Sequence, residues 1–334
     1  MISYLESGVI KSFAMNSKLH FQSIYFRNFK GFDNYFIALR EFNVLVGPNN
    51  SGKSTIIGAI RILFEGIRRA RARNPELLDF AGHTKLGYRV SLSEVPIATE
   101  NVFHNYDDSH PAEIDFVFTN KSKLKLMFPR VGLCFMACET LNKVVRSTSD
   151  FKKEFNVDLG FVPVLGPVEH DEPLYQEEAA RRALLTHRAS RNFRNIWYHY
   201  REEFSEFRRL IQSTWPGMDI ELPSIESYNP PILHMFCPED RYPREIYWAG
   251  FGFQVWCQML TFIVRSKNVS LFVVDEPDIY LHSDLQKQLV NILKNLGPDI
   301  LIATHSIEII SEVEPEDLLL VNKKHRSAKR IKTR

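Results

Sequence analysis

Long apolar runs, paired cysteines and a strong net charge are all missing from this sequence of 334 residues. No stretch approaches the roughly 18 uninterrupted apolar residues of a membrane-spanning helix, and the N-terminus lacks the basic-then-apolar order of a signal peptide. The four cysteines form no C-x-x-C pair, which favours reduced, packed thiols in a cytoplasmic protein. A net charge of +2 is too small to indicate a polyanion partner by itself, so any contact with DNA must come from a local patch.

A glycine-containing loop at residues 47–55 is the strongest pattern that is present. Its residues, Gly-Pro-Asn-Asn-Ser-Gly-Lys-Ser-Thr, match the phosphate-binding pattern G-x-x-x-x-G-K-[ST]. Residues 42–46 before it are apolar and β-prone, and apolar side chains recur at helical spacing from Ile56 to Ile67 after it. Strand, glycine turn and helix form the context that the pattern needs, so we expect the chain to bind a nucleoside triphosphate.

The physical chemistry of phosphate binding gives roles to this loop. Unpaired N–H groups at the start of the following helix, together with the helix dipole, attract phosphate oxygens. The two glycines let the backbone approach the phosphates, and the two asparagines tolerate positive φ. Lys53 is expected to reach the β- and γ-phosphates, and the Ser54 hydroxyl to ligate Mg²⁺. The predicted nucleotide-binding residues of the loop are Gly47, Pro48, Asn49, Asn50, Ser51, Gly52, Lys53, Ser54 and Thr55.

Two acidic residues follow a second apolar strand. Residues 271–274 are purely apolar, and Asp275 and Glu276 come directly after them, at the carboxyl edge where α/β sheets bind ligands. Asp275 is predicted to complete the Mg²⁺ site with Ser54, and Glu276 to orient or deprotonate the attacking water. A polar turn is the alternative interpretation, but the phosphate loop in the same chain favours the catalytic one.

A histidine follows a third predicted strand, residues 299–303. Because the carboxyl ends of parallel strands lie at one edge of a sheet, His305 is expected close to Glu276. There it can donate a hydrogen bond to the γ-phosphate and report its presence. A lone histidine is more often structural, but this position favours the sensor.

Two further turns are candidates for contact with the nucleotide. Lys30 lies in a basic turn between two predicted strands, 21–26 and 35–39, and either touches base or phosphate or is simply solvated. Gly250 and Gly252 precede a helix with an apolar face, which would make an anion site without a lysine of its own. The best use of such a site is to cap the triphosphate of a second copy; a turn that only starts a core helix is the alternative.

A charged helical segment separates the two groups of motifs. Residues 173–213 carry apolar side chains at helical spacing from Phe193 to Ile211, and Trp215-Pro216-Gly217 ends the run. The mixed charge of its polar face favours a solvated helix over a nucleic-acid surface, although arginine is in excess. We interpret the segment as an arm, a lid or a docking surface. The arginines predicted on the polar face are Arg181, Arg182, Arg188, Arg191, Arg194, Arg201, Arg208 and Arg209.

The order of these motifs resembles the ATP-binding-cassette (ABC) type ATPases of the RecF, SMC and OLD (overcoming lysogenisation defect) group. The details are most similar to the ATPase domain of OLD nucleases, and the resemblance covers about residues 19–330. It implies an α/β P-loop ATPase core, in which a mixed or parallel sheet has flanking helices, with an antiparallel β subdomain and a helical insertion. The segments that carry it are residues 47–55, Phe193-Arg-Asn195, Gly250-Phe-Gly252-Phe-Gln254, Asp275-Glu-Pro-Asp-Ile-Tyr-Leu-His282 and Ala303-Thr-His-Ser306.

The same resemblance implies ATP and Mg²⁺ as cofactors and a head-to-head homodimer or an oligomer of such dimers. The catalytic residues would be Lys53, Glu276 and His305 in one copy, with Gly250 and Gly252 supplied by the other. Ala249 departs from the family, because the cassette signature usually has a serine there that contacts the γ-phosphate.

A nuclease is the partner that the resemblance implies. OLD nucleases continue into a Toprim domain, whose metal site needs a glutamate and an Asp-x-Asp pair, and no Asp-x-Asp occurs in this sequence. We therefore expect a Toprim domain or subunit and DNA as partners, and no membrane. The predicted division is an N-terminal extension (1–18), a first core half with the phosphate loop (19–168), the helical insertion (169–217), a second core half (218–322) and a basic tail or linker (323–334).

Three functions fit these observations. The first is an ATPase that dimerises on ATP and gates a DNA-processing nuclease, with anti-phage defence as its role by analogy. The second is a scaffold fixed by ATP with little hydrolysis, which Ala249 favours and which would dock partners through residues 173–213. The third is a DNA repair ATPase of the RecF or SMC kind, although the insertion is short for an SMC coiled coil.

Overall fold

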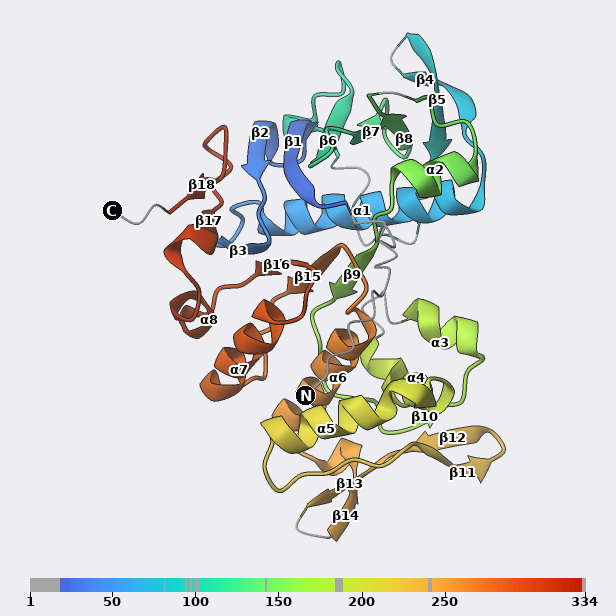
Figure 1. Cartoon of the computed structure of the whole chain (residues 1–334), viewed down its shortest axis with the longest axis vertical. Coiled ribbons are helices and arrows are strands. Elements are labelled where there is room, and N and C mark those ends of the chain that lie inside the picture. The colour runs from blue at the N-terminus through green and yellow to red at the C-terminus, as the bar shows by residue number, and fades with distance from the viewer. Residues whose placement is uncertain are drawn as a thin grey trace, which may run out of the picture.

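One long helix, α1 (Lys53–Ala72), runs between two sheets in Figure 1. The computed structural model describes residues 19–331 except 81, 94, 96–97, 99–101, 142, 184–188 and 240–241. The predicted N-terminal extension and the last three residues of the predicted tail lie outside the described residues.

The first sheet carries the phosphate loop and has six strands among the described residues. All neighbouring strands of this sheet are parallel except β17 and β18 at one edge, which are antiparallel. Its central strands are almost continuously apolar, as strands covered on both faces must be. In spatial order the strands are β18 (Lys329–Arg330), β17 (Leu318–Leu320), β3 (Phe42–Val46), β16 (Asp299–Ala303), β15 (Leu271–Asp275) and β9 (Leu159–Val162).

Side chains of this sheet alternate between two hydrophobic cores, because successive residues of a strand point to opposite faces. Val273 belongs to the core that α1 shares with both sheets. Val274 belongs to the core on the other face, which contains α6 (Phe251–Arg265) and α7 (Ser283–Lys294). The carboxyl edge of this sheet is therefore held from both sides.

The second sheet is antiparallel and covers the other side of α1. Its hairpin turn at Lys30–Gly31 is tighter than the predicted one, because the strands extend to Phe29 and start again at Phe32. The predicted α/β fold class, including this antiparallel subdomain, is confirmed. The strands in spatial order are β2 (Phe32–Ala38), β1 (Phe21–Phe29), β6 (Ala112–Phe118), β7 (Lys123–Phe128), β8 (Phe135–Glu139), β5 (His83–Arg89) and β4 (Glu76–Phe80).

The helical insertion consists of short helices rather than the long run that we expected. Its apolar stripe packs into the core around α6, as the helical spacing predicted. Arg194 does not lie on the polar face: its side chain is 0% exposed. The helices are α3 (Glu177–Ala183), α4 (Phe193–His199) and α5 (Phe204–Thr214), and nearby strands that the sequence did not predict are β10 (Glu172–Pro173), β11 (Ser224–Tyr228), β12 (Pro231–His234), β13 (Phe236–Glu239) and β14 (Tyr242–Glu245). The remaining α-helices in the described part of the chain are α2 (Thr148–Glu154) and α8 (Ile307–Ser311).

The basic segment from residue 323 is not a linker over the residues that are described. Residues 323–326 form an exposed turn, and β18 then pairs with β17. The backbone of Phe36 also exchanges hydrogen bonds with Arg326 and Ala328, at 3.0 Å each. The basic charge of the segment suggested a solvated linker, but backbone pairing with β17 and β2 holds it on the core.

Candidate functional site

The phosphate loop adopts a backbone that only its glycines allow. Gly52 has φ +117°, and a Cβ there would lie 2.4 Å from the ring of Phe32. At Gly47 a Cβ would lie 2.5 Å from the carbonyl oxygen of Val321. Asn50 has φ +62°, as expected for an asparagine in such a loop. The loop is therefore shaped by its neighbours on both sheets.

Lys53 is the first residue of α1 and points back into this loop. Its ammonium group donates hydrogen bonds to the carbonyl oxygen of Gly47 at 2.9 Å and to Nε2 of His305 at 2.7 Å. The second bond requires the histidine proton on Nδ1. Burial lowers the pKa of Lys53, while the charges of Glu276 and Asp275 oppose this effect. The side chain is only 5% exposed, and phosphate oxygens would be better partners for it than a neutral imidazole.

The ends of β15 and β16 bring the predicted catalytic residues to the same edge. Asp275 pairs in register with Ala303, and the N–H of Glu276 donates to the carbonyl oxygen of Ala303 at 2.9 Å. Oε1 of Glu276 lies 3.7 Å from Nε2 of His305. Lys53, His305 and Glu276 thus form one contiguous group. Glu276 has φ +49°, a left-handed backbone that is uncommon outside glycine and that clusters at functional sites.

Both carboxylates at this edge have raised pKa values. For both the main cause is burial; Arg61 and Lys53 oppose it at Asp275, whereas at Glu276 the charges of Asp278 and Asp275 add to it, and His305 and Lys53 oppose it. Oδ2 of Asp275 lies 3.3 Å from Nη2 of Arg61, whose own pKa is lowered by burial. The sequence analysis missed Arg61. Its position was a usable signal, since it lies two helical turns after Ser54 and so on the same face of α1.

The donors at the loop suit the two predicted cofactors. Ser54 is exposed at the mouth of the loop, and its hydroxyl with the carboxylate of Asp275 makes an oxygen-only set, which Mg²⁺ prefers. The buried hydroxyl of Ser51 has no hydrogen-bond partner among the described residues, so it has an unused donor inside the loop. Together with the glycine backbone, these groups fit a triphosphate with its Mg²⁺.

Two basic turns lie beside the loop. The N–H of Lys323 donates to the carbonyl oxygen of Ser51 at 3.1 Å, and the side chain of Lys323 passes Gly31. Lys30 is therefore in the turn that neighbours the phosphate loop, as expected. It is partly buried, whereas Lys323, which the sequence analysis had placed in a basic tail or linker, is exposed.

The glycine turn at 250–252 has different neighbours. A Cβ at Gly252 would lie 3.1 Å from the carbonyl oxygen of Tyr280, and the rings of Phe251 and Tyr280 are 6.1 Å apart. Gly250 is the N-cap of α6, and no side chain caps that helix start. The structure thus places this turn beside Tyr280 and does not bring it together with Lys53 in the contacts of the described residues.

Comparison with protein families decides what this group of residues belongs to. Residues 20–207, more than half of the chain, match the family described as "AAA ATPase domain". The chain belongs to the AAA ATPase domain family. Residues 146–311 also match a second family of AAA domains, whose description suggests "AbiEii toxin, Type IV TA system" for its members. No curated protein sequence matches this chain significantly.

Solved structures with the same fold include SMC heads and RecF. A structure of the SmcHead bound to the C-winged helix domain of ScpA has a TM-score of 0.59 at 13% identity, covering 93% of this chain and 97% of that one. The SMC head domain from Thermotoga maritima has a TM-score of 0.51 at 14% identity, covering 94% and 100%. A RecF structure has 0.55 at 11%, covering 94% and 98%. At these identities the likeness shows the fold, which is that of RecF/SMC-like ATPase domains.

Proposed function

We propose that this ATPase domain binds Mg²⁺–ATP at residues 47–55, closes on a second copy and opens again when ATP is hydrolysed. The observation that carries the proposal is the contact between Lys53, His305 and Glu276 beside the phosphate loop. Three predicted roles, phosphate binding, γ-phosphate sensing and water activation, fall on side chains that lie within 3.7 Å of their neighbours.

The chemistry of the proposed step follows from these contacts. Lys53 exchanges His305 for phosphate oxygens, which frees the imidazole to turn its own N–H toward the γ-phosphate. Glu276 accepts a proton from the attacking water, and its raised pKa brings it closer to the range of an effective general base. Ser54 and Asp275 would hold Mg²⁺, which supplies positive charge between the phosphates when it is bound.

The second copy would complete the site with its glycine turn. The amides at the start of α6 are not capped by a side chain, so they can accept an anion from outside the chain. Large apolar side chains surround the turn and are exposed, with Trp248 at 73%, Phe251 at 55% and Tyr280 at 53%. Exposed aromatic groups of this size are typical of interaction surfaces, so they support a homodimer through this face.

The biological role that we propose is control of a DNA-processing nuclease in anti-phage defence. Its support is the resemblance of the motifs to OLD nucleases, which adds a Toprim domain or subunit and DNA as partners. The RecF- and SMC-like fold is compatible with a DNA repair ATPase, which is the alternative of the same class. The neighbourhood of the gene, read for a Toprim sequence, distinguishes these two roles.

One experiment tests the central proposal. In the Glu276→Gln variant, we expect nucleotide affinity to stay within about threefold of the wild type, turnover to fall at least about 100-fold, and ATP to hold the chain as a dimer. Sedimentation of the variant with and without ATP measures the dimer. Unchanged turnover would remove Glu276 from the mechanism, and a monomer at saturating ATP would refute the closing step.

Ala249 favours a second candidate, a scaffold that ATP fixes without much hydrolysis. Its methyl group cannot make the side-chain contact that a serine would make with the γ-phosphate. Steady-state turnover with and without DNA separates the candidates, because negligible turnover in both conditions supports the scaffold. Restoring the hydroxyl with Ala249→Ser should then raise turnover.

A further inference from the structure

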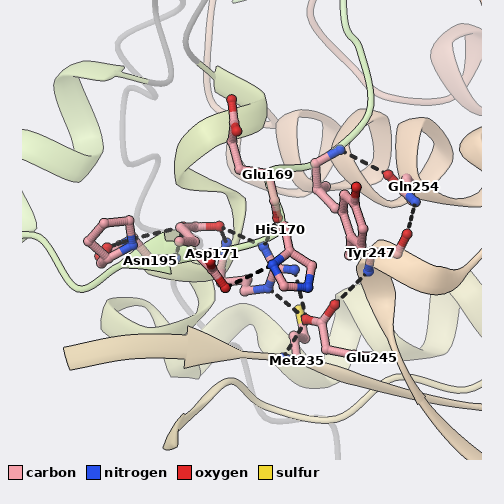
Figure 2. Close-up of polar contacts among 12 residues, drawn as sticks. Glu169, His170, Asp171, Asn195, Met235, Glu245, Tyr247 and Gln254 are labelled. Carbon is pink, nitrogen blue, oxygen red and sulfur yellow. Dashed lines mark hydrogen bonds and ion pairs between the residues drawn. The ribbon is translucent and has the colours of Figure 1, made fainter. Parts of the chain in front are cut away.

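The guanidinium of Arg194 is completely buried and lies between two acidic side chains. It donates to Oε1 of Glu245 through Nε at 2.9 Å and through Nη2 at 2.7 Å, and to Oε2 of Glu172 through Nη1 at 3.3 Å. Nη1 also donates to the carbonyl oxygen of Glu169 at 2.9 Å. Figure 2 shows the polar contacts around Glu169, Asn195 and Glu245, on both sides of this network. A charge that is buried this deeply needs an explanation beyond stability, since such pairs rarely stabilise a fold more than apolar packing does.

On one side, the network fixes the start of α4. The carboxylate of Glu172 accepts from the backbone N–H of Arg194 at 2.9 Å and from that of Asn195 at 2.7 Å. The side chain of Asn195 donates to the carbonyl oxygen of Pro173 at 2.8 Å and accepts from the N–H of Tyr175 at 2.7 Å. These bonds join the first helical turn of the insertion helix to residues 172–175.

On the other side, the network fixes the approach to the glycine turn. Besides Arg194, the carboxylate of Glu245 accepts from the N–H of Tyr247 at 2.6 Å. Gln254 of α6 donates to the carbonyl oxygens of Tyr247 and Ala249, at 2.8 Å each, and accepts from the N–H of Val168 at 2.9 Å (Figure 2). The carbonyl oxygens of Tyr247 and Ala249, which lie just before Gly250, are thereby held from inside the molecule.

We propose that Arg194, Glu245 and Gln254 are positioning residues that set where the 250–252 turn stands over the triphosphate of a second copy. The inference rests on the proposed function, because it names what places the cap. It also links the insertion to the turn, because Arg194 of α4 binds Glu245 just before it. A partner that docks on the insertion would therefore change how the turn contacts the nucleotide of the opposite copy.

The chain offers a matched control. Arg265 lies at the other end of α6 and also pairs with the insertion, through Glu203 at 3.0 Å. This pair joins α6 to residues 201–203 of the insertion, and among the described residues Arg265 has no hydrogen bond or ion pair with residues 245–254. Arg194→Lys removes the planar fork and keeps the charge, and Arg265→Lys makes the same change away from the turn.

The experiment places both changes in the full chain that carries Glu276→Gln. A fluorescent ATP analogue at low protein concentration measures the affinity of the single copy, and sedimentation at saturating ATP measures the dimer dissociation constant. We expect Arg194→Lys to leave nucleotide affinity within about twofold and to raise the dimer dissociation constant at least about tenfold, which is the split that a general loss of folding would not give. Arg265→Lys should change neither quantity.

Glu245→Gln keeps the shape of the network and replaces Arg194→Lys as the test variant if that variant does not fold. We expect it to raise the dimer dissociation constant by less than Arg194→Lys does. If both network variants dimerise like the Arg265→Lys control, the inference is overturned while the proposed function stands. If the Glu276→Gln chain binds ATP but never dimerises, the closing step of the proposed function fails and the inference with it.

Discussion

Lys53 and His305 are joined by a hydrogen bond of 2.7 Å from the ammonium group to Nε2. In this bond Nε2 of His305 accepts and carries no proton, so the lysine and the imidazole must part before the histidine can donate an N–H to the γ-phosphate. The imidazole is thus placed for a role after binding rather than for binding itself. This distinction leads to a measurable difference between affinity and turnover.

We expect His305→Ala to change nucleotide affinity by less than about threefold and to lower turnover by about tenfold to 100-fold, which corresponds to one hydrogen bond to a charged group. Equilibrium binding and steady-state turnover measure the two quantities separately. His83→Ala, at an exposed histidine of β5, is the control. Losses of equal size in affinity and turnover would instead assign His305 to ground-state binding.

Glu276 gives the site a pH dependence that can be seen without nucleotide. Burial raises its pKa, so the folded chain binds this proton more tightly than the unfolded chain does. The contribution to stability is therefore complete below the unfolded pKa and is lost as the pH rises through the folded pKa. At neutral pH and above, the charged carboxylate carries a desolvation cost that a glutamine would not have.

Glu276→Gln should accordingly raise the unfolding temperature at pH 8 by about 1–2 °C, with the gain disappearing as the pH approaches 4. Thermal unfolding of the ligand-free chain across this pH range measures the effect. The same change at the exposed Glu221 should leave the curve unmoved. A gain at pH 4 that equals the gain at pH 8 would argue against a buried carboxylate.

At the scale of elements, α1 is joined to β15 by the pair of Arg61 and Asp275. Their side chains are 18% and 20% exposed, so neither charge is well solvated. We expect Arg61→Met to lower the free energy of unfolding by about 2 kcal/mol, because it leaves Asp275 without its counterion. In an Asp275→Asn background the same change should cost less than half as much. Urea unfolding of the four chains measures this coupling, and additive losses would mean that the pair does not interact.

The phosphate loop and the antiparallel sheet meet at Gly52. A Cβ there would lie 2.4 Å from Phe32, whereas a Cβ at Gly132, which also has positive φ, has no atom within 4 Å. Gly132→Ala should therefore lower the free energy of unfolding only by the backbone strain, about 1 kcal/mol. Gly52→Ala should lower it by about 3 kcal/mol or more and should also abolish nucleotide binding. Urea unfolding and nucleotide titration of both variants check this, and equal costs would show that Phe32 yields freely.

At the scale of the whole molecule, the exposed aromatic face around the glycine turn should matter only to the assembly. We expect Trp248→Ser to raise the ATP-dependent dimer dissociation constant at least about tenfold and to leave nucleotide affinity unchanged. Leu77→Ser is the control, since Leu77 is 72% exposed on β4 and Trp248 is 73% exposed. Equal effects of the two variants would exclude the turn from the interface.

The features of this architecture that could be predicted from the sequence are those determined by residues close together in the chain. Apolar strands followed by glycine or acid, and helical spacing after Lys53, depend on neighbours in the chain, so the fold class and the positions of Asp275 and His305 could be inferred. The burial of Arg194 depends on two carboxylates that are 22 and 51 residues away in sequence. The place of the 323–331 segment depends on pairing with β17, which directly precedes it, and with Phe36 of β2, near the opposite end of the chain. The composition of the segment gives no sign of that pairing.

Helix α1 has a mechanical consequence, because it is a rod of about 30 Å with its first turn at the phosphates. Its far end is tied down as well: Arg71 bonds to Asp158, and just beyond the helix the side chain of Asn74 accepts a bond from the N–H of Thr148 at 3.0 Å. A rod clamped between two sheets bends little and slides or tilts as one piece. Triphosphate bound in the loop should thus alter the surroundings of Thr148, at the other end of this helix.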